Sequence, residues 1–242
     1  MDRKVLLGIV LIAGIVTPSA WPEAAARKPA GEITYALGWI KDEPTLRVEG
    51  RGVKLSKRVG RDHVSIRVEV KGDVVELQAD VAGRVRIGRK GRFLTLQMKD
   101  SFEASIAKVQ KLTAGSEALE GLEGLVASMA GDERQAARSV LTSYALLHAV
   151  RGSAAPTRAV ASTFKPFTGG VAARASFGRE EGPFACWAEY ASTVSNYLVE
   201  FNACFENYWW IPGWTSACAF QFSLQSELAW FWLISCSGGM PV

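Results

Sequence analysis

The sequence predicts an α+β protein: a small antiparallel β-meander or sandwich, three amphipathic helices, a flexible linker and a C-terminal disulfide-clamped antiparallel helical hairpin. Three observations lead to this prediction. Residues 33–98 alternate apolar and polar side chains, which is the period of a half-buried strand. Residues 102–150 repeat apolar side chains at steps of three and four, which is the period of a helix. The four cysteines lie near the C-terminus at spacings of whole helical turns.

The N-terminus has the pattern of a signal peptide, which we assign to residues 1–26. Arg3 and Lys4 precede an apolar run from Val5 to Val16, which is shorter than the roughly 20 residues that a membrane-spanning helix needs. The small residues that follow offer cleavage after Ala20 or after Ala26. These features predict a secreted or periplasmic protein, with a retained membrane anchor as the alternative.

The β-patterned stretch is clearest at His63–Val70, where apolar side chains occupy every second position. A tight turn at Gly72–Asp73 leads to the next strand, but it sets Glu69 opposite Glu76, so a longer turn is the alternative. Further strands are expected at residues 33–40, 45–49, 52–55, 75–79, 84–87 and 93–98. Together they predict an antiparallel meander of six or seven strands.

Three amphipathic helices follow and complete a first unit of residues 31–152. Asp100 with Glu103 resembles a capping box, Ser116 caps the second helix, and Asp132 opens the third, which Gly152 ends. We expect their apolar stripes to cover one face of the sheet, because each stripe must be buried against another element.

Residues 153–182 contain Pro, Gly and scattered Arg without periodicity, and they predict an exposed linker. Arg158, Arg174 and Arg179 offer sites to a protease, with an uncut tether as the alternative. Composition changes across this linker. The chain has a net charge of +4, but residues 183–242 hold four Glu and no Lys, Arg or Asp, together with 15 of the 24 aromatic residues. This shift marks a second unit.

The cysteine spacing predicts the disulfide pairing. Cys186 and Cys204 would lie about 27 Å apart on one helix, whereas the Cα atoms of a disulfide approach within about 7 Å. Antiparallel helices folded at the segment around Pro212 and Gly213 pair Cys204 with Cys218 and Cys186 with Cys236; the crossed pairing requires parallel helices. A zinc site is the other use of four cysteines, but structural zinc draws its ligands from closely spaced pairs.

Large aromatic side chains remain outside the stripes on which the two helices are expected to meet. They include Trp187, Trp230 and Phe231, together with Trp209, Trp210 and Trp214, which we predict to form a contact surface. Their partner is the preceding unit, a second copy, a membrane interface or another protein.

No catalytic or cofactor motif accompanies this layout. The two histidines, His63 and His148, are expected at a strand start and on the apolar side of a helix, and no nucleophile elbow or phosphate loop is present. We therefore expect a non-enzymatic binding protein without cofactor, metal, nucleic acid or small-molecule substrate, whose partner is a protein or a membrane interface. The alternatives are a precursor of a cleaved C-terminal toxin or bacteriocin-like peptide, and an enzyme of unrecognised type.

Overall fold

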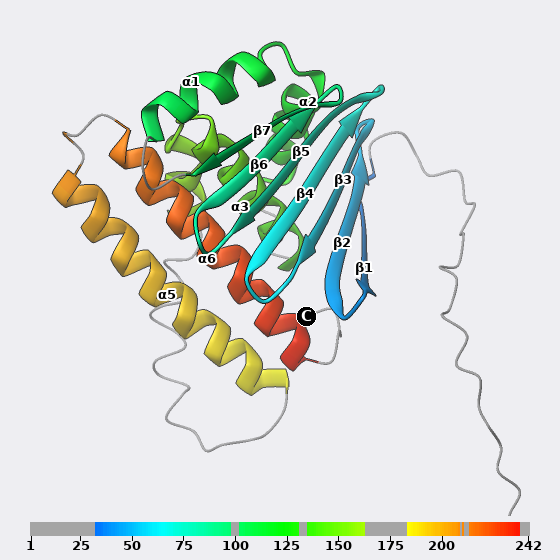
Figure 1. Ribbon diagram of the computed structural model, residues 1–242. Helices are drawn as coiled ribbons and strands as arrows, with labels where there is room; N and C mark the ends of the chain where they lie inside the picture. Colours follow the sequence, from blue (N-terminus) through cyan, green and yellow to red (C-terminus); the bar gives the residue numbers. More distant parts are fainter. Residues whose placement is uncertain are drawn as a thin grey trace, which may run out of the picture.

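The computed structural model describes residues 32–97, 102–130, 135–162, 183–208, 210 and 213–237, so the predicted signal peptide lies outside the described residues. Strands come first and helices follow, which confirms the α+β prediction (Figure 1). The strands are β1 (Thr34–Ile40), β2 (Glu43–Gly50), β3 (Val53–Val59), β4 (His63–Val70), β5 (Asp73–Asp80), β6 (Arg84–Arg89) and β7 (Arg92–Gln97). The helices are α1 (Phe102–Thr113), α2 (Glu117–Ser128), α3 (Gln135–Val150), α5 (Pro183–Tyr208) and α6 (Trp214–Cys236).

The seven strands form one antiparallel sheet in which each strand pairs with the next along the chain. This is the meander that the alternating pattern predicts. Two-residue turns join β4 to β5 and β6 to β7, and their residues have positive φ angles: 48° and 84° at Lys71 and Gly72, 51° and 74° at Lys90 and Gly91. Such turns match the right-handed twist of the strands and hold the register of each hairpin.

The β4–β5 hairpin corrects the predicted turn. The turn is Lys71–Gly72 and not Gly72–Asp73, so Val70 pairs directly with Asp73. This register places Arg67 opposite Glu76, and their side chains form an ion pair. The unfavourable Glu–Glu pair is therefore avoided by a shift of the turn rather than by a longer turn.

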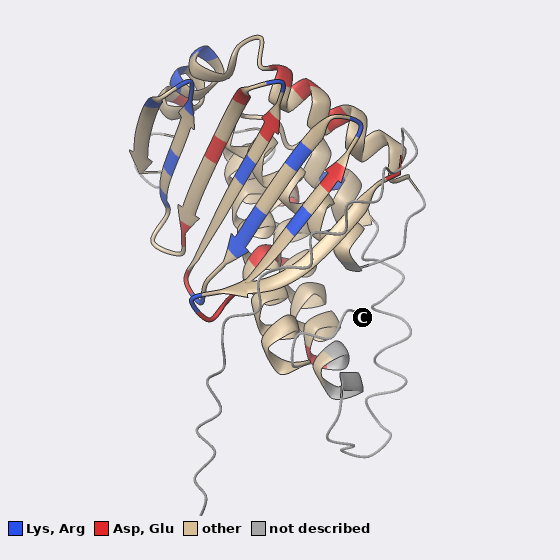
Figure 2. Ribbon diagram, turned by 90° about the vertical axis from the view of Figure 1, so that its right-hand side faces the viewer, with Lys and Arg blue, Asp and Glu red and all other residues tan. Residues whose placement is uncertain are grey.

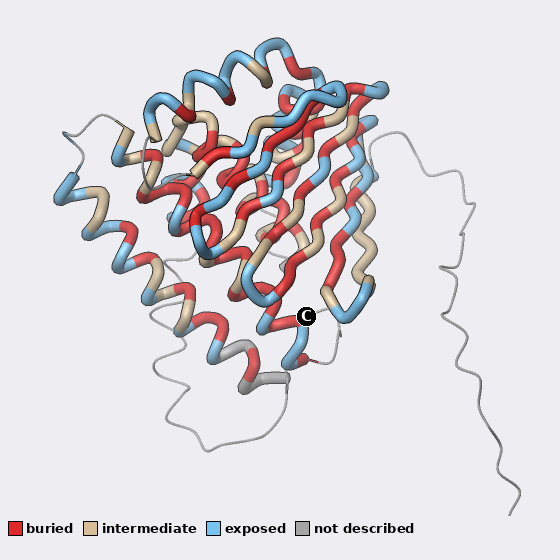
Figure 3. Tube along the Cα trace, in the orientation of Figure 1, coloured by how far each residue is buried: buried red, intermediate tan, exposed pale blue. Residues whose placement is uncertain are grey.

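Alternation gives the sheet an apolar inner face and a charged outer face. Along β4, Val64, Ile66 and Val68 are buried whereas Arg67 is exposed, and β3, β5 and β6 alternate in a similar way (Figure 3). The first strand, β1, has no fully buried residue. Figure 2 shows that positions of Lys, Arg, Asp and Glu are spread along the strands. The helices pack against the inner face.

Two of the three central helices cover the sheet as predicted, and one does not. α1 packs against β6 and β7, and α2 packs against β3, β4 and β5. The hydroxyl of Ser116 accepts a hydrogen bond from the Leu119 amide at 3.4 Å and caps α2. α3 packs mainly against α6 instead, because α6 occupies the inner face over β2, β3 and β4. Asp100 and Asp132, the predicted caps of α1 and α3, lie outside the described residues.

The hairpin of α5 and α6 is part of the same core. α6 runs between α5 and the rest of the protein, where it contacts α3 and the sheet (Figure 1). It is apolar on nearly all sides because neighbours cover it on nearly all sides. None of the described helices is both long enough and apolar enough to span a bilayer.

A further helix occupies the start of the range predicted as a linker. Residues 155–162 are helical, and Thr157, Val160 and Ala161 are buried. The hydroxyl of Thr157 lies 3.2 Å from that of Ser223 on α6, and the guanidinium of Arg158 lies 3.6 Å from the ring centroid of Phe205 on α5. Arg158 is thus packed against the hairpin, while residues 163–182 lie outside the described residues.

Candidate interaction surface on the C-terminal hairpin

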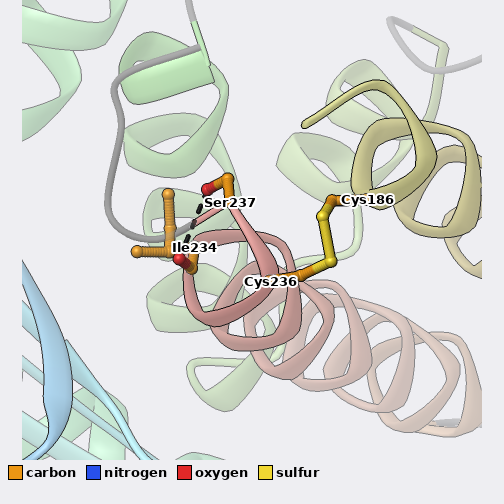
Figure 4. The surroundings of a disulfide bond; sticks show 4 residues. All are labelled: Cys186, Ile234, Cys236 and Ser237. Atoms are coloured by element: carbon orange, nitrogen blue, oxygen red, sulfur yellow. Dashed lines mark hydrogen bonds between the residues drawn. A yellow bond between two sulfur atoms is a disulfide. The ribbon is translucent and has the colours of Figure 1, made fainter. Parts of the chain in front are cut away.

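Two disulfides clamp α5 to α6 with the predicted pairing. Cys186 bonds Cys236 at the open end of the hairpin and Cys204 bonds Cys218 near the connection, with Cα atoms 5.7 Å and 5.9 Å apart. Figure 4 shows the Cys186–Cys236 bridge at the end of α6, where the hydroxyl of Ser237 donates a hydrogen bond to the carbonyl of Ile234. All four cysteines are used, so none is left for zinc. Two such bridges indicate an oxidising environment.

The side of α6 that faces the sheet buries aromatic residues that the hairpin alone leaves uncovered. Trp230 and Phe231 are 2% and 7% exposed. They belong to the core cluster that also contains residues of the sheet, α2 and α3. Of the partners considered from the sequence, the preceding unit of the same chain therefore covers this part of the aromatic surface.

A buried cluster of polar side chains joins α6 to β3 and α3. The ammonium group of Lys57 forms an ion pair and hydrogen bond with the carboxylate of Glu227, and both side chains are fully buried. Lys57 also donates to the hydroxyl and, at 3.3 Å, to the carbonyl of Ser139. The hydroxyls of Ser143 and Thr142 donate to the other carboxylate oxygen of Glu227 at 2.7 Å and 3.1 Å. Each charge is thus paired and hydrogen-bonded, as burial requires.

Burial lowers the pKa of Lys57 below its ordinary value, and the adjacent Glu227 carboxylate opposes part of this change by attraction and by hydrogen bonding. The ammonium group also lies 4.4 Å from the ring centroid of Trp230, which adds a cation–π contact. Every partner of the two charges comes from β3, α3 or α6 itself. The cluster therefore links α6 to both β3 and α3.

Sequence reasoning did not identify this cluster, although two signals pointed to it. Lys57 occupies an inward position in β3, in phase with the buried Val53, Leu55 and Val59. Glu227 is the one charged residue of α6, in a helix that is otherwise apolar or neutral. A charged residue at a core position of each element predicts that the two meet, because an unpaired buried charge is strongly unfavourable.

Aromatic side chains remain exposed at the tip of the hairpin, which we define as Tyr208, Trp210 and Trp214. Their exposed fractions are 42%, 66% and 43%. The rings of Tyr208 and Trp214 lie 5.4 Å apart between centroids, and the indole N–H of Trp210 donates to the carbonyl of Asn207 at 3.1 Å. Trp210 and Trp214 belong to the predicted contact surface, whereas the third member, Trp209, lies outside the described residues.

The hairpin also exposes apolar side chains away from the tip. Trp232, which is 60% exposed, lies 18 residues after Trp214 and therefore on the same side of α6, at its other end. Val199 on α5 is 68% exposed. The ring of Trp232 contacts that of Phe231, which is buried, whereas Tyr208 and Trp214 are both exposed and pack on each other. The tip therefore exposes paired aromatic rings close to the Cys204–Cys218 disulfide.

The two histidines lie on different elements and have different neighbours. Burial, with Arg151 nearby, lowers the pKa of His148 to about 4, and its ring lies 4.3 Å from that of Tyr144 between centroids. His63 is partly exposed beside Glu43 and Asp62, at 3.4 Å and 3.0 Å. In the described part of the chain, no three His, Cys, Asp or Glu side chains gather in a way that suits a metal ion.

Comparisons of the chain with protein-family models, with curated proteins and with solved structures found no match. Its own residues and their arrangement are therefore what bears on function.

Proposed function

We infer that this is an exported, non-enzymatic binding protein whose contact element is the tip of the C-terminal hairpin. The observation that carries the proposal is the exposure of Tyr208, Trp210 and Trp214 at a point that the Cys204–Cys218 bridge holds in place. Export accords with the signal-peptide pattern of residues 1–26 and with the two disulfides.

Selective exposure supports a binding role for the tip. The chain buries Trp230, Phe231 and Phe222 of the same hairpin almost completely. The protein therefore has a core that can accommodate large aromatic residues, and the tip residues lie outside it. Trp and Tyr are the residues that most often dominate the binding energy of protein interfaces, because they bury a large area with few rotatable bonds. A clamped tip also loses little conformational freedom on binding.

The partner we favour is a protein with an apolar pocket and a basic rim. The hairpin has no Lys or Arg, and three of its four Glu are exposed, since only Glu227 is paired with Lys57 in the core. One of the exposed residues, Glu206, lies two residues before Tyr208. A lipid interface is the alternative, since Trp and Tyr also lie well at a bilayer surface. The acidic charge of the hairpin disfavours anionic lipids, which attract Lys and Arg.

The burial of α6 argues against the precursor of a released C-terminal peptide. Release of the hairpin would separate Glu227 from Lys57 and expose Trp230 and Phe231 to water. If the chain were cleaved between residues 163 and 182, these noncovalent contacts would therefore keep the hairpin bound to the rest of the protein. Mass spectrometry of the exported protein tests this: an intact chain that lacks only its leader supports the binding protein, and a free hairpin peptide overturns it.

An enzyme is less favoured because the polar groups that resemble catalytic ones are out of reach of a substrate. Lys57, Ser139 and Glu227 bring an amine, a hydroxyl and a carboxylate together, but they are 0%, 2% and 0% exposed. A general base must come within hydrogen-bond distance of the proton that it removes, and no substrate reaches this cluster in the folded protein.

Site-specific photo-crosslinking tests the contact element in the cell that produces the protein. A photo-reactive phenylalanine analogue replaces Trp210 in one variant and Trp232 in a matched control, since both are exposed tryptophans of the same hairpin. We expect irradiation to give one discrete protein adduct from position 210 and none from position 232, and Trp214→Ala to weaken the adduct several-fold. Identical adducts from both positions, or none from position 210, would contradict the proposal; lipid adducts would favour the membrane interface.

A further inference from the structure

The outer face of the sheet carries a ligand-sized hollow that is separate from the hairpin. Its volume is about 320 Å³, and residues of all seven strands line it. The described helices lie against the opposite face (Figures 1 and 2). Pockets of about 300–1,000 Å³ are the size that small molecules occupy.

Polar side chains from neighbouring strands meet in this hollow through the register of the sheet. Arg58, Ser65, Gln78 and Arg86 lie side by side on β3, β4, β5 and β6, each directly opposite the next. All four line the hollow. The row therefore has a guanidinium group at each end and a hydroxyl and an amide between them.

The arginines of the hollow differ in how their charge is compensated. Arg58 forms an ion pair with Glu43 at 2.9 Å, and Arg67 forms ion pairs with Glu76 and, at 3.3 Å, with Glu69. Arg86 has no carboxylate within ion-pair distance among the described residues. Its positive charge is therefore available to a ligand.

Phe93 orients the guanidinium group of Arg86. The guanidinium carbon lies 4.4 Å from the centroid of the Phe93 ring, which is itself 46% exposed. The ring lies over Gly88 on the adjacent strand, so closely that a Cβ atom at Gly88 would be 2.3 Å from a ring carbon. Glycine at this position thus allows the ring to lie flat on the sheet and to support Arg86.

Two neutral donors complete the site. The side chains of Gln78 and Ser65 lie next to Arg86 along the row, and neither hydrogen-bonds to another side chain or backbone group of the described residues. An amide N–H and a hydroxyl beside an uncompensated guanidinium are the groups that bind the oxygens of a carboxylate or phosphate.

We propose that this hollow binds a small molecule through an oxyanion group, a carboxylate or a phosphate, which Arg86 holds with the help of Gln78 and Ser65. The site is independent of the hairpin tip, so the protein binds a small anionic ligand in addition to the partner proposed above. Arg86 supplies the charge, and Phe93 limits its freedom before the ligand arrives.

Isothermal titration of the full exported protein with benzoate, citrate and inorganic phosphate tests the site. Arg86→Gln is the informative variant and Arg84→Gln is its matched control, because Arg84 lies on the same strand and face but is paired with Asp80 at 2.7 Å. We expect saturable binding of at least one probe, weakened on the order of tenfold to a hundredfold by R86Q and unchanged by R84Q. Tighter binding of phosphate than of the two carboxylates assigns a phosphate ligand, and the reverse order assigns a carboxylate.

A second variant keeps the charge of Arg86 and displaces the Phe93 ring that orients it. Gly88→Ala displaces the Phe93 ring and is expected to weaken the same probe several-fold, while near-ultraviolet circular dichroism shows that the core remains folded. Absence of saturable binding for all three probes at millimolar concentration, or equal weakening by R86Q and R84Q, would overturn the proposal, since the second result would show a nonspecific effect of net charge.

Discussion

Lys57 and Glu227 lie 170 residues apart in the chain and form an ion pair in the centre of the protein. The pair joins the third strand to the last helix, with Ser139, Thr142 and Ser143 of α3 completing the hydrogen bonds. Desolvation offsets most of the attraction within a buried ion pair, so the net contribution of such a pair to overall stability is small as long as both partners are present. It ties the disulfide-clamped hairpin to the sheet.

Removal of one partner of this pair is expected to destabilise the protein strongly. Lys57→Met leaves Glu227 buried without its cation and should lower the free energy of unfolding by about 3 kcal/mol. The double variant Lys57→Met with Glu227→Leu should be much less destabilised than the sum of the two single variants, because no buried charge remains. Urea denaturation under non-reducing conditions measures all of these variants.

The matched control for Lys57 is Lys54→Met on the same strand, whose exposed side chain should change stability by no more than about 0.5 kcal/mol. Additive effects in the double variant would mean that Lys57 and Glu227 are not coupled.

The two disulfides are expected to differ in their effect on stability and on binding. Replacement of Cys186 and Cys236 together by Ser opens a loop of 50 residues and should cost about 4 kcal/mol, against about 3 kcal/mol for Cys204 and Cys218. The second pair lies at the tip, so its loss should also reduce photo-crosslinking from position 210, whereas loss of the first pair should leave it intact. Calorimetry and the crosslinking assay separate the two effects, and a tip adduct that survives without Cys204–Cys218 would refute a role for that bridge in binding.

Two glycines of α2 should respond in opposite ways to the same substitution. A Cβ atom at Gly121 would lie 2.7 Å from Cγ2 of Val70, because the helix packs closely on the sheet there, whereas nothing lies within 4 Å at Gly124. Gly121→Ala should therefore lower the free energy of unfolding by about 1–3 kcal/mol, and Gly124→Ala should raise it by up to about 1 kcal/mol through helix propensity. Thermal denaturation shows whether each variant is more or less stable than the unmodified protein. Stabilisation by both substitutions would mean that α2 lies farther from the sheet than the structure has it.

Asp73 is expected to make stability fall in acid. Burial opposes its ionisation, but hydrogen bonds from Arg89, Ser116 and the Ala118 amide outweigh this and lower its pKa from 3.8 to about 2. The folded state then binds the proton less tightly than the unfolded state, so the contribution is complete above a pH of about 4 and is lost as the pH falls towards 2. After allowance for solvent screening, we expect ionised Asp73 to contribute about 1 kcal/mol to the free energy of unfolding.

The variant Asp73→Asn tests this contribution through urea denaturation across the acid range. Its deficit relative to the unmodified protein should be present at neutral pH and should shrink towards zero as the pH approaches 2. A deficit that does not change with pH would assign the effect of the substitution to packing instead of charge.

Local patterns were sufficient for the disulfides and for the elements apart from the helix at residues 155–162, a stretch that was predicted as linker. Alternation predicted the strands of the meander because each strand has one buried face, and the spacing of Cys186, Cys204, Cys218 and Cys236 predicted their pairing because a helix places residues five turns apart on one side. The turn between β4 and β5 was placed one residue too late, since several registers satisfy the same alternation and the Arg67–Glu76 pair distinguishes them.

The sequence by itself determined that a β-meander, amphipathic helices and a cross-linked helical pair are present, because these depend on periods within a short stretch of chain. Only the tertiary structure decided that α6 displaces α3 from the sheet, that Lys57 meets Glu227, and that Trp230 is buried while Trp210 is exposed. Those outcomes depend on which apolar surfaces cover one another in three dimensions, and residues distant in the chain contribute to every one of them.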